Sequence, residues 1–560
     1  MRRLKSLGVL IGAAGLLTAA AACGSSGPSS GSGTSTSSGP TGTLTISNEF
    51  GSTWTCQFNP FNPNVSILPF GPVYEPLVFM DNLESGKTSP WLATSWAWSD
   101  GNKVLTFNIR PGVKWSDGVP FTAKDVVFTF DELKKFPGLD IQSDWSFLSS
   151  VAQKGSDQVV MTFKTAGTAN FYYAADQTPI IPEHIWASIK NPVTYNDNHP
   201  IGTGAYTVSA CTPENITYSA NKHYYISGEP KVATVDYPAF LSNNTANQEL
   251  ADGQAQWGNQ FIPSIQSFYS SKSASNKYWF PPTVNNEIFI NLKKPLLDEL
   301  PVRQAMAYAI DRQKVSQIGE YGYEPPANQT GIVTPTFSSW QDTAEAAKYN
   351  YDYDPAKAKA ILTAAGFKMG SNGIFETSSG TPLQFTIVNI GDYSDWVASM
   401  QIIQQEFKAV GIGLTVDNLS SNAYDAAMFN GNYELGYNTE SGGPGPYYEL
   451  RQWLLSANSA PIGQTAATNW ERYENPATDA LLNEYSAASP AQQHQIIDQL
   501  QEVMLSQVPL IPVTESVDWY EYNTADFTGW PTASNPYDQP GPALTPDFGW
   551  TLLHLAPAKG

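Results

Sequence analysis

The segment at residues 438–448 combines side chains that could bind a small solute. It contains Asn438, one carboxylate at Glu440, three glycines and the neighbouring tyrosines Tyr447 and Tyr448. Glycine lets a ligand approach the backbone closely, and tyrosine offers a flat apolar face with a polar tip. These groups indicate stacking and hydrogen bonding rather than bond cleavage.

The sequence offers little support for catalysis. It contains no CxxC or HExxH pattern, and its five histidines are scattered. The 51 Asp and Glu residues could form many acid–base pairs, so their presence alone does not predict a hydrolase. We therefore expect no enzyme activity, no cofactor and no metal site, with a secreted glycan hydrolase as the remote alternative.

Regular elements must position the 438–448 loop. Residues 433–437 are typical of a strand, and ligands collect beyond the carboxyl ends of strands in open α/β sheets. Before it, alternating residues at 383–387 and 412–416 flank apolar positions with helical spacing at 396–410. This order predicts a β–α–β unit with parallel strands.

Local signals predict further elements. Leu105, Phe107 and Ile109 alternate with polar residues as a half-buried strand does, and Thr122 with Asp125 matches a helix capping box. Pro301 is suited to open a helix. Asp354 is suited to cap a second helix, which begins with Pro355.

The N-terminus predicts export. Basic residues precede an apolar run at 7–17 and small residues that lead to Cys23. This layout resembles a bacterial lipoprotein signal in which Cys23 is lipidated; the alternative is an ordinary cleavage site with a chance cysteine. We assign 1–22 to the signal peptide and the Gly/Ser/Thr/Pro-rich residues 23–42 to a tether. The protein is then expected outside the cytoplasm, at the cell surface or in the periplasm.

Charge and cysteine content narrow the partners. Without the signal, 27 basic residues accompany 51 acidic ones, a net charge of −24. Such a balance disfavours nucleic acid and leaves the lipid anchor as the only expected membrane contact. With Cys23 lipidated, Cys56 and Cys211 remain, either as one disulfide or as two buried thiols.

Several short sequence motifs follow one another along the chain. The sequence contains Ser89-Pro90-Trp91-Leu92, Arg110-Pro111-Gly112-Val113-Lys114-Trp115-Ser116-Asp117-Gly118, Ile201-Gly202-Thr203-Gly204-Ala205-Tyr206 and Val302-Arg303-Gln304-Ala305-Met306-Ala307-Tyr308-Ala309-Ile310-Asp311-Arg312. Together they resemble the family 5 extracellular solute-binding proteins of ABC importers, the dipeptide, oligopeptide and nickel-binding group.

The resemblance implies an α/β, two-lobed periplasmic-binding-protein-like fold with an inserted small domain and a cleft closed by hinges. Its layout, carried over, places lobe I at 43–70, 201–295 and 511–560, the inserted domain at 71–200 and lobe II at 296–510.

The resemblance also implies ligand contacts. Tyr437 and Glu440 align with a Trp and an acidic residue of peptide-binding relatives, in which the acid pairs with the peptide amine. We expect a facing wall from residues 54–66 and a third contribution from 279–286. The expected contact residues are Glu440, Tyr437, Asn438, Tyr447, Trp54, Phe58, Asn62, Asn64, Trp279 and Asn286.

The implied function is capture of an oligopeptide-like solute by a monomer that delivers it to the permease subunits of an ABC importer. An oligosaccharide is the alternative ligand, because the Gly/Pro-rich loop and the abundant aromatics also suit a sugar. Nickel is a further possibility within the family.

Overall fold

The computed structural model describes residues 39–48, 53–62, 70–349, 351–440, 442–466 and 468–558. The predicted signal peptide, Cys23 and the tether up to residue 38 lie outside these residues. The first strand begins at Thr41, within the last two residues assigned to the tether. None of the helices in the described ranges has the length and apolar content to span a bilayer.

Three large sheets organise the described chain. The first has seven strands in the order β12 (Asn276–Tyr278), β20 (Glu521–Asn523), β11 (Trp257–Asn259), β1 (Thr41–Asn48), β10 (Val232–Pro238), β9 (Asn215–Ala220) and β8 (Tyr206–Thr212). The second has five strands in the order β17 (Gly413–Leu419), β16 (Gln384–Ile390), β18 (Leu435–Thr439), β13 (Pro282–Ile290) and β19 (Leu510–Val517). The third has four strands in the order β4 (Ala93–Ser99), β5 (Val104–Ile109), β7 (Gln158–Phe163) and β6 (Leu148–Lys154).

Small two-stranded sheets and α-helices make up most of the remaining regular structure. Three two-stranded sheets pair β2 (Val78–Asp81) with β3 (Lys87–Pro90), β14 (Lys368–Met369) with β15 (Phe375–Glu376), and β21 (Phe527–Thr528) with β22 (Ala556–Pro557). The α-helices are α1 (Ala123–Lys135), α2 (Asp144–Phe147), α3 (Glu183–Trp186), α4 (Asn243–Ala251), α5 (Ile265–Phe268), α6 (Leu300–Ala309), α7 (Arg312–Lys314), α8 (Thr343–Tyr349), α9 (Pro355–Ala364), α10 (Ser394–Val410), α11 (Ser421–Phe429), α12 (Pro446–Leu454), α13 (Pro476–Glu484), α14 (Pro490–Gln507) and α15 (Asp547–His554).

The predicted helix starts and the half-buried strand are confirmed. Thr122 caps α1, because its backbone N–H donates to Asp125 Oδ2 at 2.8 Å and its hydroxyl accepts from the backbone N–H of Lys124. Asp354 caps α9 in a similar way, accepting from the Lys357 backbone N–H at 2.8 Å. Alternate residues of β5 are buried, as the sequence pattern requires.

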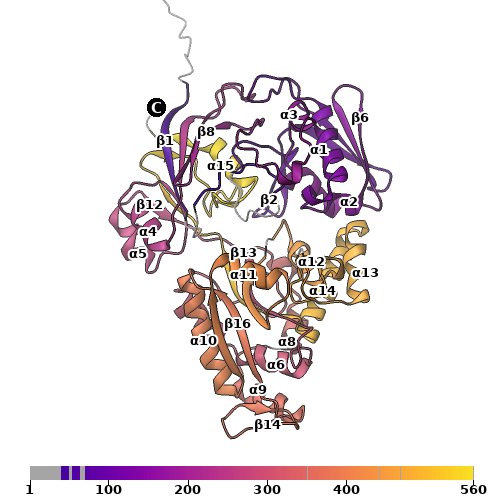
Figure 1. Cartoon of the computed structure of the whole chain (residues 1–560), viewed down its shortest axis with the longest axis vertical. Coiled ribbons are helices and arrows are strands. Elements are labelled where there is room, and N and C mark those ends of the chain that lie inside the picture. Colours follow the sequence, from indigo (N-terminus) through magenta and orange to yellow (C-terminus); the bar gives the residue numbers. More distant parts are fainter. Residues whose placement is uncertain are drawn as a thin grey trace, which may run out of the picture. The chain divides into compact units, whose positions relative to one another are not determined.

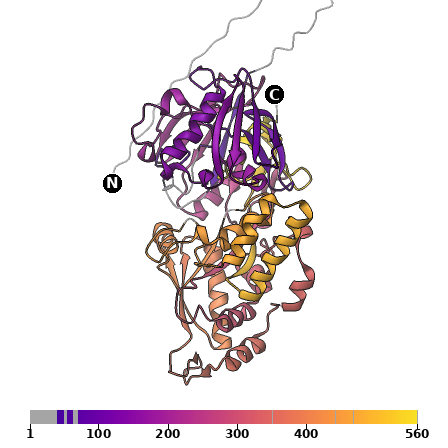
Figure 2. The same ribbon diagram turned by 90° about the vertical axis from the view of Figure 1, so that its right-hand side faces the viewer.

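The predicted β–α–β unit forms the outer part of the five-stranded sheet. β16 and β17 run parallel, and α10 packs against both strands between them in sequence. Figure 1 shows α10 alongside β16, and Figure 2 shows the same region after a quarter turn. α10 ends at Gly411, whose φ of 84° is the left-handed conformation that glycine adopts without strain. The predicted strand at 433–437 lies two residues later in the structure, as β18.

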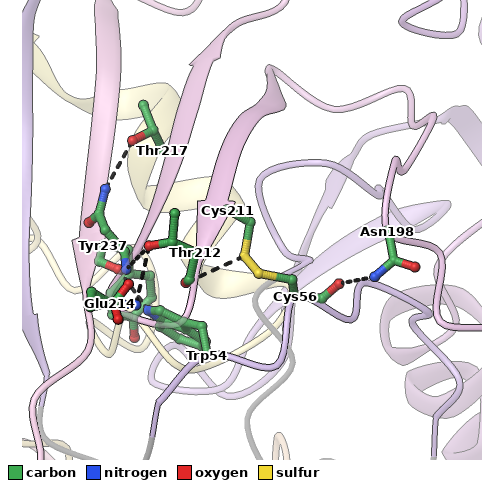
Figure 3. The surroundings of a disulfide bond; sticks show 9 residues. Trp54, Cys56, Asn198, Cys211, Thr212, Glu214, Thr217 and Tyr237 are labelled. Carbon is green, nitrogen blue, oxygen red and sulfur yellow. Dashed lines mark hydrogen bonds between the residues drawn. A yellow bond between two sulfur atoms is a disulfide. The ribbon is translucent and has the colours of Figure 1, made fainter.

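A disulfide joins Cys56 to Cys211 in the seven-stranded sheet region (Figure 3). Cys211 lies in β8 at the edge of the sheet, and Cys56 lies 155 residues earlier in the chain. Asn198 Nδ2 donates to the Cys56 carbonyl at 2.7 Å and so ties the same loop to a third segment. The bridge therefore fastens the segment that follows β1 to the sheet that contains it.

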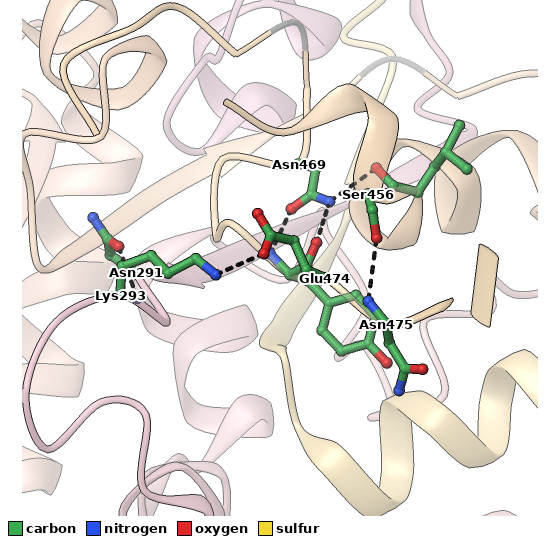
Figure 4. Close-up of polar contacts among 8 residues, drawn as sticks. Asn291, Lys293, Ser456, Asn469, Glu474 and Asn475 are labelled. Atoms are coloured by element: carbon green, nitrogen blue, oxygen red, sulfur yellow. Dashed lines mark hydrogen bonds and ion pairs between the residues drawn. The ribbon is translucent and has the colours of Figure 1, made fainter. Parts of the chain in front are cut away.

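Polar contacts hold the far end of β13 in the five-stranded sheet. Asn291, just after β13, donates from Nδ2 to the carbonyls of Gly431 and Tyr433, next to β18. Lys293 then pairs with Glu474 at 3.0 Å, and nearby Asn475 donates from its backbone to Ser456 Oγ at 3.1 Å (Figure 4). This network fixes the chain where it leaves β13.

The strand pairing differs from two of the expected lobe boundaries. β13 and β19 were expected in lobe I, because boundaries were drawn at 295/296 and 510/511, yet both strands pair within the five-stranded sheet. In the described chain, the backbone then passes directly between strands of the two larger sheets at residues 279–281 and 518–520 alone. These two segments contact one another, since Trp279 N donates to the Tyr520 carbonyl and Asp518 N to the Pro281 carbonyl, each at 3.0 Å. The three-part division itself stays a prediction.

Candidate functional site

A cavity of about 250 Å³ has walls from both larger sheets. On the side of the seven-stranded sheet the lining residues are Asn48, Asn243, Asn259, Gln260 and Phe261. On the side of the five-stranded sheet they are Glu324, Tyr393, Asp395, Trp396, Thr439, Ser516 and Val517. Trp519, from one of the two connecting segments, and Ala543 complete the lining.

The cavity lies where strands end. Asn48 and Asn259 are the last residues of β1 and β11, which run parallel to one another. Thr439 and Val517 are the last residues of β18 and β19, and Asp395 lies in the first turn of α10, the helix after β16. Ligand sites in open α/β sheets occur at such carboxyl ends, because the loops that leave the strands are free to vary there.

The wall from the seven-stranded sheet is neutral and rich in amides. Asn48 Nδ2 donates to the Tyr237 hydroxyl at 2.8 Å, and Gln260 Nε2 donates to Ser47 Oγ at 3.2 Å. These bonds fix the amides before any solute arrives, which reduces the entropy that binding must remove. Phe261 and Trp519 add aromatic surface, with ring centroids 5.4 Å apart.

The opposite wall is acidic. Glu324 is 1% exposed, and its Oε2 accepts from Asn286 Nδ2 at 2.6 Å and from Thr514 Oγ1 at 2.7 Å. Asp395 is 6% exposed, and Glu320 lies next to the pair, accepting from Ser399 Oγ at 2.6 Å. We call Glu320, Glu324 and Asp395 the cavity-side carboxylates.

Burial shifts the titration of these groups. Desolvation raises the pKa of Glu324 to about 8, with the charge of Asp395 adding to the rise. Burial likewise raises the pKa of Asp395 to about 6, and burial with the charges of Glu324 and Asp395 raises that of Glu320. No basic side chain is among the residues lining the cavity in the described chain.

A second set of carboxylates lies on the other face of the five-stranded sheet. Successive residues of a strand face opposite ways, so Glu287 and Asn438, which pair across β13 and β18, face away from the Asn286–Thr439 pair. Glu440 follows on that face, where the charges of Glu449 and Glu471 act on it. We call Glu287, Glu440, Glu449 and Glu471 the far-side carboxylates.

The far-side carboxylates are also buried. Trp453 Nε1 donates to Glu287 Oε1 at 3.1 Å, and the Asn285 backbone N–H donates to Glu449 Oε1 at 2.8 Å. Both carboxylate oxygens of Glu440 are buried without a hydrogen bond to any described residue. Burial is the main cause that raises the pKa of Glu440, and it raises that of Glu449 to about 8.

Comparison with known proteins identifies the family. The model of the bacterial extracellular solute-binding proteins, family 5 (middle region), matches residues 87–461. The chain belongs to this family. Family 5 proteins are solute-binding transport proteins rather than enzymes, and the predicted resemblance and two-lobed α/β fold are confirmed.

Individual relatives within family 5 are distant in sequence and near in structure. The chain is 24% identical to the nickel-binding periplasmic protein of Escherichia coli K12 over 73% of this chain and 78% of that protein. It is 29% identical to the oligopeptide-binding protein AppA of Bacillus subtilis 168 over 56% and 58% of the two chains. A mannohexaose-bound periplasmic oligopeptide-binding protein of Thermotoga maritima superposes with a TM-score of 0.84 at 27% identity, covering 92% of this chain and 99% of that one.

Two of the residues expected to contact the solute lie directly behind the cavity. Asn286 is fully buried and donates to Glu324, which lines it. Tyr437 is also fully buried; its ring packs edge-on against Trp396 at 5.2 Å, and its hydroxyl lies 3.5 Å from Thr514 Oγ1. Both residues support the acidic wall from the second layer.

The other expected contact residues lie elsewhere. Glu440 and Asn438 face the far side of the sheet, and Tyr447 stacks on Tyr485 at 4.0 Å with its hydroxyl on the Leu482 carbonyl. Trp279 is half-buried in a connecting segment, where its backbone pairs with Tyr520.

The described part of the expected wall, residues 54–62, packs largely inside the protein. Trp54 donates from Nε1 to the Tyr237 carbonyl at 2.8 Å, and Phe58 is fully buried. Asn62 donates from Nδ2 to Gln57 Oε1 at 2.8 Å. Asn64 lies outside the described residues. Large aromatic side chains bury well, and here they contribute to the core rather than to the cavity.

The residues that do line the cavity were missed, although one rule could have found several of them. The same carboxyl-end argument that selected the loop after residue 437 also applies to β1, β11 and β16. β1 ends at Asn48, β11 ends at Asn259, and the helix that follows β16 contains Asp395. Glu324 follows no strand, so no sequence pattern indicated it.

Proposed function

We propose that this protein is the extracytoplasmic solute-binding component of an ABC importer and that it captures an oligopeptide-like solute in the cavity between the two larger sheets. It then hands the solute to the permease subunits of the importer. Family membership supports the transport role, and the names of AppA and the Thermotoga maritima protein support a peptide-like ligand.

One observation carries the proposal: the cavity draws its walls from two sheets that only two short segments connect. A rotation about residues 279–281 and 518–520 would bring the amide wall and the acidic wall together around a solute, as hinge closure does in two-lobed binding proteins. Amides, carboxylates and aromatic rings together suit a peptide, whose backbone needs donors and acceptors and whose side chains need apolar surface.

We further propose that the protein acts as a monomer and is held at the membrane by a lipid on Cys23. A tether rich in Gly and Ser suits this role, because it lets the folded part reach the permease while the anchor stays in the bilayer.

Isothermal titration calorimetry tests the ligand class directly. The protein with Cys23→Ser is titrated with tri- to pentapeptides of mixed sequence and, separately, with mannohexaose. We expect saturable peptide binding with a dissociation constant near 1 μM, about 8 kcal/mol of binding free energy. Hinge closure is followed in parallel by small-angle scattering, as a decrease in the radius of gyration upon peptide addition.

Binding of mannohexaose without peptide binding would contradict the proposed ligand class while leaving the transport role intact. Cleavage of a bound peptide or glycan, detected by mass spectrometry of the recovered ligand, would contradict the assignment as a binding protein.

A further inference from the structure

Two of the cavity-side carboxylates differ from ordinary buried acids, because they line a cavity whose described lining contains no basic side chain. Glu324 and Asp395 line this space, and the charges of both act on Glu320. Burial of several carboxylates without a counter-ion is costly, so a protein normally pairs such groups or leaves them protonated. In the described chain no lysine, arginine or histidine belongs to the cavity lining.

One carboxylate oxygen of the acidic wall has no hydrogen bond to a described residue. Asp395 is 94% buried, and its Oδ1 has no hydrogen bond to any described residue. The Thr439 hydroxyl, also in the lining, is likewise without a described partner. By contrast, Glu324 Oε2 is fixed by Asn286 and Thr514. One acid is therefore held in place, while the other, also among the residues that line the cavity, has a buried acceptor oxygen without a hydrogen bond.

We propose that Asp395 and Glu324 form a cation subsite of the cavity, which selects solutes that carry an ammonium or guanidinium group. This inference rests on the proposed function. Such a group donates two or more hydrogen bonds and brings the positive charge that this wall lacks. The amide wall opposite would bind the neutral remainder of the solute.

An organic cation suits the subsite better than a metal ion. The described residues contain no group of three or more His, Cys, Asp or Glu side chains arranged to hold a metal. One oxygen of Glu324 is already engaged by two donors, and Trp396 and Tyr393 provide aromatic surface beside Asp395. Aromatic faces stabilise organic cations, whereas hard metal ions require more oxygen ligands.

The subsite is distinct from the amine-binding position expected at Glu440. Glu440 lies beyond Thr439 on the far side of the five-stranded sheet and does not line this cavity. The two positions therefore make different predictions for the same ligand.

Three tripeptides and one polyamine test the subsite by calorimetry: trialanine, N-acetyl-trialanine, N-acetyl-Ala-Lys-Ala and spermidine. We expect at least one of the two cationic peptides to bind ten times more tightly than N-acetyl-trialanine. In Asp395→Asn and Glu324→Gln this preference should fall to twofold or less. Glu471→Gln, which neutralises a fully buried far-side carboxylate, is the matched control and should keep the preference. Melting temperatures of all variants establish that they are folded.

The outcomes separate this subsite from the proposed function. Peptides that bind equally well with and without a cation would overturn the subsite and leave peptide capture standing. Spermidine binding that Asp395→Asn abolishes, without any peptide binding, would support the subsite and contradict the peptide ligand. A preference for the cationic peptides that Glu440→Gln abolishes and Asp395→Asn does not would overturn the subsite in favour of the far-side position. If no cationic ligand binds at all, the subsite is overturned as well.

Discussion

The two faces of the five-stranded sheet bury similar carboxylates in different surroundings. On one face Glu324 and Asp395 border a cavity shared with the seven-stranded sheet. On the other face Glu449 and Glu287 bond to neighbouring protein groups, Asn285 and Trp453. Burial raises the pKa of the glutamates on both faces, so a raised pKa alone does not distinguish a ligand site from an interior cluster.

What distinguishes the faces is what a ligand can reach. A solute that enters between the two larger sheets meets the ends of β18 and β19, and the one-residue alternation of β18 determines that it meets Thr439 rather than Glu440. The comparison teaches that strand register decides which residues face the cavity: Thr439 lines it, and the next residue, Glu440, does not.

The largest expected effect is the pH dependence of stability, to which both faces contribute. The carboxyl groups of Glu324, Glu449 and Asp395 have pKa values of about 8, 8 and 6 in the folded protein, above their ordinary values. Between the two values the folded protein keeps protons that the unfolded chain has released. This stabilisation is complete below about pH 4 and is lost as the pH rises through 6 to 8. We expect the melting temperature of the solute-free protein to fall by on the order of 5 °C from pH 5 to pH 8.5.

Variants on each face sharpen this prediction. Glu471→Gln should reduce the decline whether or not a solute is present, because its site is not at the cavity. A bound cation should reduce the decline only through the cavity-side carboxylates, and Asp395→Asn should remove that effect of the solute. A melting temperature that rises steadily from pH 5 to pH 8.5 would contradict the raised pKa values of these acids, because the folded protein would then not be destabilised when they become charged.

An intermediate effect separates the faces through two adjacent asparagines of β13. Asn286 bonds to Glu324 on the cavity side, whereas Asn285 bonds to Glu449 on the far side. Because a typical intramolecular hydrogen bond contributes a net stabilisation of about 0.5–1.5 kcal/mol, we expect Asn286→Ala to weaken binding of a cationic peptide about three- to tenfold. Asn285→Ala should lower the melting temperature and leave the affinity unchanged. Calorimetry with the same peptide checks both variants; equal losses of affinity would mean that the two faces are not independent.

Much of the fold was predictable because local signals agreed with tertiary structure. The capping box at Thr122, the proline that opens α6 and the parallel pair β16–β17 each follow from short-range chemistry that packing reinforces. The placement of β13 and β19 was not predictable in this way, because only strand pairing shows which sheet a crossing strand joins.

The site was less predictable, for a geometric reason. Residues selected for their chemistry, such as Trp54 and Tyr447, are types that serve equally well as core, and the structure buries both. Glu440 was selected from the loop that follows β18, but the sequence did not fix where β18 ends or which of its residues faces the cavity. Asn286 was selected within β13, and the structure gives it a supporting position behind Glu324.

The smallest expected effect concerns Tyr437, which the sequence predicted as a direct solute contact. In the structure its hydroxyl lies 3.5 Å from Thr514 Oγ1, the outer limit of a hydrogen bond, while Thr514 bonds to Glu324 at 2.7 Å. Its ring is fully buried against Trp396. Tyr437→Phe keeps this packing and removes only the weak contact, so we expect peptide affinity to change less than about twofold and stability by less than about 1 kcal/mol.

Tyr437→Ala provides the contrast, because loss of a buried ring typically destabilises by about 3–5 kcal/mol and would remove the support of Trp396 beside Asp395. Calorimetry and thermal melting of the two variants separate the hydroxyl from the ring. A tenfold loss of peptide affinity in Tyr437→Phe with an unchanged melting temperature would mean that the hydroxyl reaches the solute. The cavity would then extend past Thr439 to Tyr437, and the division between a binding face and a supporting layer would have to move by two residues along β18.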